Sequence, residues 1–129
     1  MTEVILDASA LLALLKNEPG GAKVAEVVMS SRMSAVNYAE VVSHFIHAGM
    51  PAPEVDAMLD PLPMTLVEAD ADLARIAGRL RLITSNAGLS LGDRFCLALA
   101  ARDGLPAWTA DRKWRSVAEA AGVVVVVIR

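Results

Sequence analysis

The chain has 129 residues, of which 55% are hydrophobic and 21% charged, so it can form one hydrophobic core and is not a disordered chain. Its net charge of -3 requires that any nucleic-acid partner be contacted through a local basic patch. No apolar run approaches the ~18 residues needed to cross a bilayer. The start of the chain lacks a basic secretory segment, and Cys96 is the single cysteine, which suits a reducing cytoplasm. We therefore expect one cytoplasmic domain over residues 1–129, with no membrane partner.

The first half of the chain predicts strands alternating with helices. Val4 to Leu6 is a short apolar run typical of a buried strand, and the Ala- and Leu-rich segment 8–16 predicts a helix directly after Asp7. After a turn at 17–21, we expect a helix over 22–30, a strand over 32–36, a helix from Asn37 to before Gly49, a short helix from Pro51 or Pro53 to Leu59, and a strand over 64–67.

The second half continues the alternation and ends in a run of valines. We expect a long helix over 70–82, a loop over 85–88, an apolar helix from Ser90 to Gly104, a strand over 106–109, a turn or short helix over 111–115, a helix over 117–121 and a strand over 123–128. Five successive valines favour a strand buried on both faces, as in parallel sheets. The fold class is therefore α/β, with a central, mainly parallel sheet of about five strands flanked by helices.

Four carboxylates occupy the predicted strand-to-helix junctions, namely Asp7, Glu40, Asp93 and Asp111. Taken singly, each has a plainer explanation as a helix cap, and Asn37-x-x-Glu40 and Ser90-x-x-Asp93 both fit a capping box. If all four junctions share one sheet edge, however, the acids meet in one cleft, where their repulsion requires a compensating cation. Oxygen ligands alone favour Mg²⁺ or Mn²⁺ over zinc.

At these positions the chain resembles PIN-domain nucleases, with a length similar to the VapC-type toxins of bacterial toxin–antitoxin pairs. The motifs that carry the resemblance are Leu6-Asp7-Ala8-Ser9, Asn37-x-x-Glu40, Leu91-Gly92-Asp93 and Thr109-Ala110-Asp111. The resemblance implies that the four acids are catalytic, holding one or two Mg²⁺ ions, with Mn²⁺ as a substitute, for hydrolysis of RNA. It also implies that Ser9 and Thr109 are supporting hydroxyls. Arg112 follows Asp111 where many relatives carry a further acid, so the resemblance supports the binding of a second metal ion less than that of the first.

Several other polar and aromatic residues have both a functional and a purely structural interpretation. Arg94, Arg112, Lys113 and Arg115 surround the two later acids and are candidates for binding the RNA backbone, or are ordinary solvated charge. Trp114 is a better candidate than Trp108 for stacking on bases, with a core position as the alternative. His44 and Cys96 are interpreted as a surface histidine and a buried, inert thiol.

Partners are expected from the resemblance and from the apolar excess. These are an RNA substrate, a cognate antitoxin whose tail carries an arginine, and a second copy of the chain contacting the helix face that bears Tyr38, Val42, Phe45 and Ile46. A groove near Leu12, Leu15 and Val24 is expected to hold the antitoxin tail. The alternatives are a housekeeping PIN nuclease in RNA processing, a catalytically idle acid-pocket binding domain, and a phosphoacceptor receiver, which the final strand disfavours because it lacks a lysine.

Overall fold

The computed structural model describes residues 3–129 and places five strands in one sheet in which every neighbouring pair is parallel. The strands are β1 (Val4–Leu6), β2 (Ser31–Ser34), β3 (Thr65–Val67), β4 (Ala107–Thr109) and β5 (Val125–Val127). Their order across the sheet is β3-β2-β1-β4-β5, so β1 is the central strand. The predicted α/β class is confirmed. Met1 and Thr2, which bear on the expected lack of a secretory signal, lie outside the described residues.

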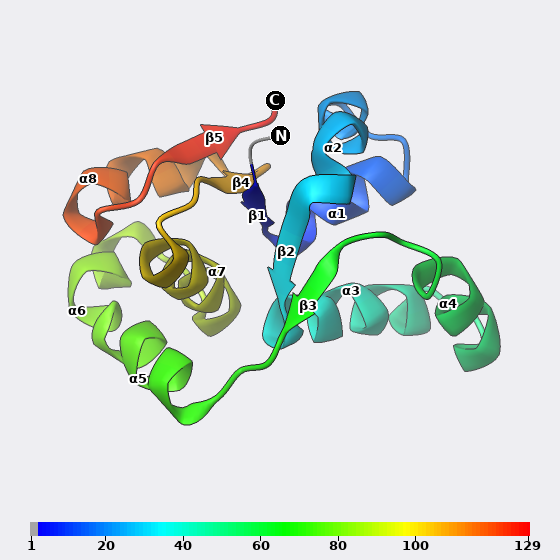
Figure 1. Cartoon of the computed structure of the whole chain (residues 1–129), viewed down its shortest axis with the longest axis horizontal. Coiled ribbons are helices and arrows are strands. Elements are labelled where there is room, and N and C mark those ends of the chain that lie inside the picture. Colours follow the sequence, from blue (N-terminus) through cyan, green and yellow to red (C-terminus); the bar gives the residue numbers. More distant parts are fainter. Residues whose placement is uncertain (1–2) are drawn as a thin grey trace.

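Helices cover both faces of the sheet. The first group is α1 (Ala8–Leu15), α2 (Gly21–Val27), α3 (Ala35–His47) and α4 (Ala52–Leu59), and the second is α5 (Ala71–Arg79), α6 (Arg81–Thr84), α7 (Leu91–Asp103) and α8 (Ala118–Ala121). Figure 1 shows the two groups on opposite sides of the central strands. Because side chains alternate along a strand, Val4 and Leu6 pack with the first group whereas Ile5 packs with the second.

The start of α3 differs from the sequence-based prediction. The second strand ends at Ser34 rather than Val36, and the Ser34 hydroxyl accepts a hydrogen bond from the Val36 N–H, capping a helix that begins at Ala35. The predicted Asn37 capping box is therefore wrong, because Ser34 supplies the cap three residues earlier. As a result, Glu40 lies in the second turn of α3 and not at its start.

The helix predicted over 70–82 is divided in the structure. α5 ends at Arg79, Leu80 adopts φ -64° and ψ -15°, and α6 follows from Arg81. The hydroxyl of Thr84 donates to the carbonyl of Leu80 four residues earlier, a hydrogen bond of the kind that often bends a helix. The loop predicted over 85–88 is instead a 3₁₀ turn (Ser85–Ala87) that ends at Gly88 in the left-handed conformation.

The valine run also departs from its prediction. It does form β5, but β5 pairs only with β4 and lies at the edge of the sheet, where its three residues are only half-buried. Val124 is 69% exposed. The interpretation as a strand buried on both faces is wrong, because side chains alternate between the two faces and all three residues of β5 keep partial solvent exposure.

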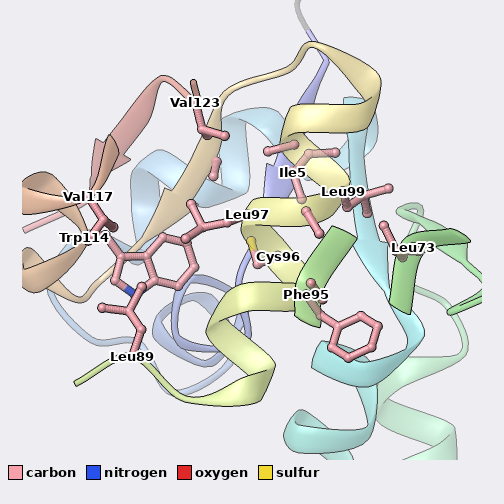
Figure 2. Close-up of a cluster of buried hydrophobic side chains, with 14 residues drawn as sticks. Ile5, Leu73, Leu89, Phe95, Cys96, Leu97, Leu99, Trp114, Val117 and Val123 are labelled. Carbon is pink, nitrogen blue, oxygen red and sulfur yellow. The ribbon is translucent and has the colours of Figure 1, made fainter. Parts of the chain in front are cut away.

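The core on the side of α7 shows where two of the singled-out residues lie. Trp114, in the 3₁₀ turn Arg112–Ser116, is 0% exposed and packs in one cluster with Leu89 and Val117, as Figure 2 shows. It belongs to the core, so the suggestion that it stacks on bases is wrong. Cys96 is buried in the same cluster as a free thiol, as predicted.

Among the helices of residues 3–129, none combines the length and apolar character needed to cross a membrane.

Two helical glycines provide a test of the packing. A Cβ on Gly21 would lie 2.4 Å from the carbonyl oxygen of Ala13, which is backbone and cannot move aside, whereas a Cβ on Gly78 would meet nothing within 4 Å. We predict that Gly21→Ala lowers the free energy of unfolding by about 1–3 kcal/mol. Gly78→Ala should raise it by about 0.5–1 kcal/mol through helix propensity. Chemical denaturation of the two variants measures both changes in the free energy of unfolding. An equal change for Gly21→Ala and Gly78→Ala would contradict the α1–α2 packing.

Candidate functional site

The site forms at the carboxyl edge of the two central strands. β1 and β4 run parallel with Leu6 beside Trp108, so the residues that follow them, Asp7 and Asp111, emerge at the same edge. Ligands of open α/β sheets bind at this edge, against the N-termini of helices.

Asp7 is held by two hydroxyl groups and not by its own helix. One carboxylate oxygen, Oδ2, accepts hydrogen bonds from Ser9 Oγ at 2.6 Å and from Thr109 Oγ1 at 3.0 Å. Asp7 occupies the N-cap position of α1, yet its side chain makes no capping hydrogen bond. The plainer explanation of Asp7 as a helix cap is therefore not supported by its contacts.

The two hydroxyls are themselves fixed by the backbone after β4. Ser9 Oγ accepts from the N–H of Ala110 at 2.9 Å, and Thr109 Oγ1 accepts from the N–H of Asp111 at 3.1 Å. With their own hydrogens directed to Asp7, both hydroxyls orient its carboxylate. The structure thus places Ser9 and Thr109 in contact with Asp7.

Glu40 reaches the site from α3 and lies against α7. The Nδ2 of the buried Asn37 donates to Glu40 Oε1 at 2.8 Å and to the carbonyl oxygen of Gly92 at 2.9 Å. A Cβ on Gly92 would stand 2.5 Å from either carboxylate oxygen of Glu40. Neither contact was anticipated from the sequence, although a glycine inside a helical pattern commonly indicates close packing.

Asp93 lies in the first turn of α7, where its predicted capping box with Ser90 is confirmed. Asp93 Oδ2 accepts from the Ser90 N–H at 2.8 Å, and the Ser90 hydroxyl accepts from the Asp93 N–H at 3.2 Å. A capping box ties the acid to the backbone, and it leaves Asp93 Oδ1 without a capping bond.

The charges of Glu40 and Asp93 act on Asp7, so the three acids lie near one another. Burial, followed by the charges of Asp93 and Glu40, raises the pKa of Asp7 from 3.8 to about 6, against the lowering effect of its hydroxyl partners. Partial desolvation and then the charge of Asp93 raise the pKa of Glu40, against the hydrogen bond from Asn37. Burial and the same three acids also raise the pKa of the Cys96 thiol, which keeps it protonated.

Asp111 and the basic residues are arranged less tightly. Asp111 Oδ1 accepts from the Lys113 N–H at 2.9 Å and so caps the 3₁₀ turn, and Asp111 Oδ2 lies 3.8 Å from Lys113 Nζ. Arg112, Lys113 and Arg115 are exposed beside it. Arg94 departs from the expectation of a surface cation, because it is only 8% exposed. His44 packs edge-on against the ring of Phe45, with the ring centroids 5.2 Å apart.

The acids suit a hard cation by their chemistry, although they do not form a closed cage. Within residues 3–129, no group of three or more His, Cys, Asp or Glu side chains is placed so that it could hold a metal ion. The donor set nevertheless fits Mg²⁺, because it consists of oxygen atoms and because three mutually repelling carboxylates gain from a divalent ion.

The family model of the PIN domain matches residues 4–120. The chain belongs to the PIN domain family. Solved structures with this PIN fold include a toxin–antitoxin complex from Klebsiella pneumoniae (TM-score 0.72, 19% identity, 98% of each chain covered) and VapBC-5 from Mycobacterium tuberculosis (TM-score 0.70, 24% identity, covering 99% of this chain and 100% of that one). VapC20 of M. tuberculosis, described as a sarcin–ricin-loop-cleaving toxin, has a TM-score of 0.73 at 18% identity, with 94% of this chain and 96% of that one covered. No curated protein sequence matches the chain.

The raised pKa of Asp7 gives a prediction for this PIN domain without metal. In the folded protein the charged form of Asp7 is disfavoured, and the rise from 3.8 to about 6 corresponds to about 3 kcal/mol above pH 6. Asp7→Asn should therefore raise the free energy of unfolding by about 1–3 kcal/mol at pH 7. The gain should shrink as pH falls from 6 to 4, where wild-type Asp7 becomes protonated. Urea denaturation at several pH values in EDTA measures this; a loss of stability at pH 7 would contradict the electrostatic account.

Proposed function

We propose that this PIN domain is a metal-dependent endoribonuclease that hydrolyses RNA phosphodiester bonds and acts as the toxin of a toxin–antitoxin pair. Mg²⁺ is the proposed ion and Mn²⁺ its substitute. The observation that carries the proposal is the convergence of Asp7, Glu40 and Asp93 at one sheet edge, where the charges of Asp93 and Glu40 raise the pKa of Asp7 and the charge of Asp93 raises the pKa of Glu40.

Asp7, Glu40 and Asp93 would hold the ion, with Asp111, just after the neighbouring strand β4, as a fourth oxygen donor. A divalent ion there supplies positive charge for the attacked phosphate and lowers the pKa of water bound to it. Ser9 and Thr109 orient the carboxylate of Asp7 through the hydrogen bonds at 2.6 and 3.0 Å. The chain therefore contributes ligands and their orientation, and needs no nucleophilic side chain.

The exposed cations beside Asp111 are the proposed RNA contacts. Arg112, Lys113 and Arg115 lie within one 3₁₀ turn directly after the β4 edge. Phosphate contacts by such residues position the backbone without selecting a sequence. Arg94 is left out of this set because of its burial.

The toxin role rests on the likeness to toxin–antitoxin proteins. Some of these were solved with DNA, such as VapBC2 from Rickettsia felis bound to a fragment of its promoter (TM-score 0.74, 14% identity, covering 99% of this chain and 100% of that one). We propose an antitoxin partner whose arginine binds the acids bidentately, and a homodimer as the assembly. Val24 is fully buried, so the expected tail groove cannot include it, and Phe45 packs in the monomer core whereas Ile46 is exposed.

A catalytically idle acid-pocket domain is the second candidate, because no group of three or more His, Cys, Asp or Glu side chains in the described part of the chain, residues 3–129, could hold a metal ion. Such a domain need not bind a divalent ion, so titration with Mn²⁺ separates the two candidates. A housekeeping role in RNA processing would be distinguished from a toxin by the absence of an antitoxin gene directly upstream.

The proposal predicts the effect of removing one ligand charge. Asp93→Asn should lower the rate of Mg²⁺-dependent RNA cleavage by more than about 100-fold, since changes to groups behind metal ligands already cost about 10–100-fold. Asp72→Asn is the matched control, because Asp72 lies on α5 with its side chain 85% exposed and should leave the rate unchanged. Gel assays of RNA cleavage with Mg²⁺ and with EDTA give the readout. Wild-type rates for Asp93→Asn, or full activity in EDTA, would contradict the mechanism.

A further inference from the structure

Glu40 and Asp93 stand on different helices, so their meeting depends on the contact between α3 and α7. Asn37 joins the two helices next to Glu40. Its side-chain amide nitrogen donates to Glu40 Oε1 on its own helix and also to the carbonyl oxygen of Gly92 on α7. The first hydrogen bond lies within α3, so a wider spacing of the two helices would break the second, to Gly92.

The orientation of the Asn37 amide is dictated by its partners. Both are acceptors, a carboxylate oxygen and a carbonyl oxygen, so only the NH₂ end can face them. Asn37 is fully buried, and its Oδ1 has no hydrogen-bond partner among the described residues. A fully buried amide that leaves one acceptor unmatched is costly, which indicates that its donation to the other two groups is what the position requires.

Gly92 is required for space and not for backbone conformation. It lies inside α7 and is not among the glycines with positive φ, so alanine could adopt its conformation and would favour the helix. The atoms that a Cβ would meet are the two carboxylate oxygens of Glu40, at 2.5 Å each. The missing side chain of Gly92 therefore provides the volume in which the Glu40 carboxylate lies.

We propose that Asn37 and Gly92 form a seat that positions the carboxylate of Glu40 toward Asp7 and Asp93 for binding of the divalent ion. The two residues, called the Glu40 seat, are positioning residues and touch neither ion nor substrate. This inference rests on the proposed metal-dependent function, which it deepens by adding the residues that arrange one ligand.

Gly92→Ala tests the seat by filling it, and Gly78→Ala is the matched control because its added Cβ enters open space. Electron paramagnetic resonance of free Mn²⁺ gives the dissociation constant of each variant. We expect Gly92→Ala to weaken Mn²⁺ binding about 10–100-fold. Its fold should persist, because the obstructed atoms are the end of a flexible side chain. Gly78→Ala should bind Mn²⁺ as the wild type does.

A double-mutant cycle shows whether the effect passes through Glu40. In a Glu40→Gln background, Gly92→Ala should cause a much smaller further loss of Mn²⁺ affinity than in the wild type. Unchanged affinity in Gly92→Ala, or an equal loss in both backgrounds, would overturn the seat.

A metal-free measurement separates failure of the seat from failure of the proposed function. By NMR in EDTA, the two Nδ2 protons of Asn37 should exchange slowly in the wild type and rapidly in Gly92→Ala. Asn37→Ser, which keeps one donor, should bind Mn²⁺ more tightly than Asn37→Ala. Protected Asn37 protons in a wild type that binds no Mn²⁺ would overturn the metal function, whereas unprotected protons in a wild type that does bind Mn²⁺ would overturn the seat.

Discussion

Asp7 places a carboxylate at the end of the central strand with only 4% of its surface exposed, and this burial shapes the surrounding structure. Removing a charge from water is costly unless hydrogen bonds or an opposite charge compensate it. Here Ser9 and Thr109 supply the hydrogen bonds, and they in turn are fixed by the backbone that follows β4. The compensation is incomplete, since the pKa of Asp7 still rises to about 6.

The neighbouring acids do not compensate the negative charge of Asp7 but add further negative charge beside it. Glu40 and Asp93 add repulsion, and neither forms an ion pair with a described basic residue. A domain that only needed stability would carry neutral groups at these positions. The arrangement is explained if a divalent cation is the missing partner, which is the general pattern of functional sites with perturbed pKa values.

The sequence predicted what depends on local pattern and left open what depends on long-range packing. The strand-to-helix alternation, the Ser90–Asp93 capping box and the junction positions of the acids follow from short-range chemistry. The start of α3 was misplaced because Ser34 and Asn37 are both good caps, and the choice between them depends on where β2 ends. The edge position of β5 depends on strand order, which the valine run does not encode.

The site itself shows the same division. Asp7, Ser9 and Thr109 were anticipated together, although only the fold shows the hydroxyls donating to the acid. The contact of Glu40 with Gly92 joins residues far apart in the chain and has no local signature. The sequence left Trp114 open between stacking on bases and a core position, and the fold decides for the core, because the 3₁₀ turn directs the indole inward while Lys113 and Arg115 point to solvent.

Proton release on metal binding tests the central claim, that Asp7, Glu40 and Asp93 form one cation site, most directly. A ligand must be deprotonated to bind an ion, so an acid with a pKa of about 6 loses its proton as the ion enters. Calorimetric titration with Mn²⁺ in buffers of different ionisation enthalpy counts these protons. The account predicts release of about half a proton or more per ion at pH 6, falling toward zero by pH 8. Absence of Mn²⁺ binding, or binding at pH 6 without proton release, would contradict it.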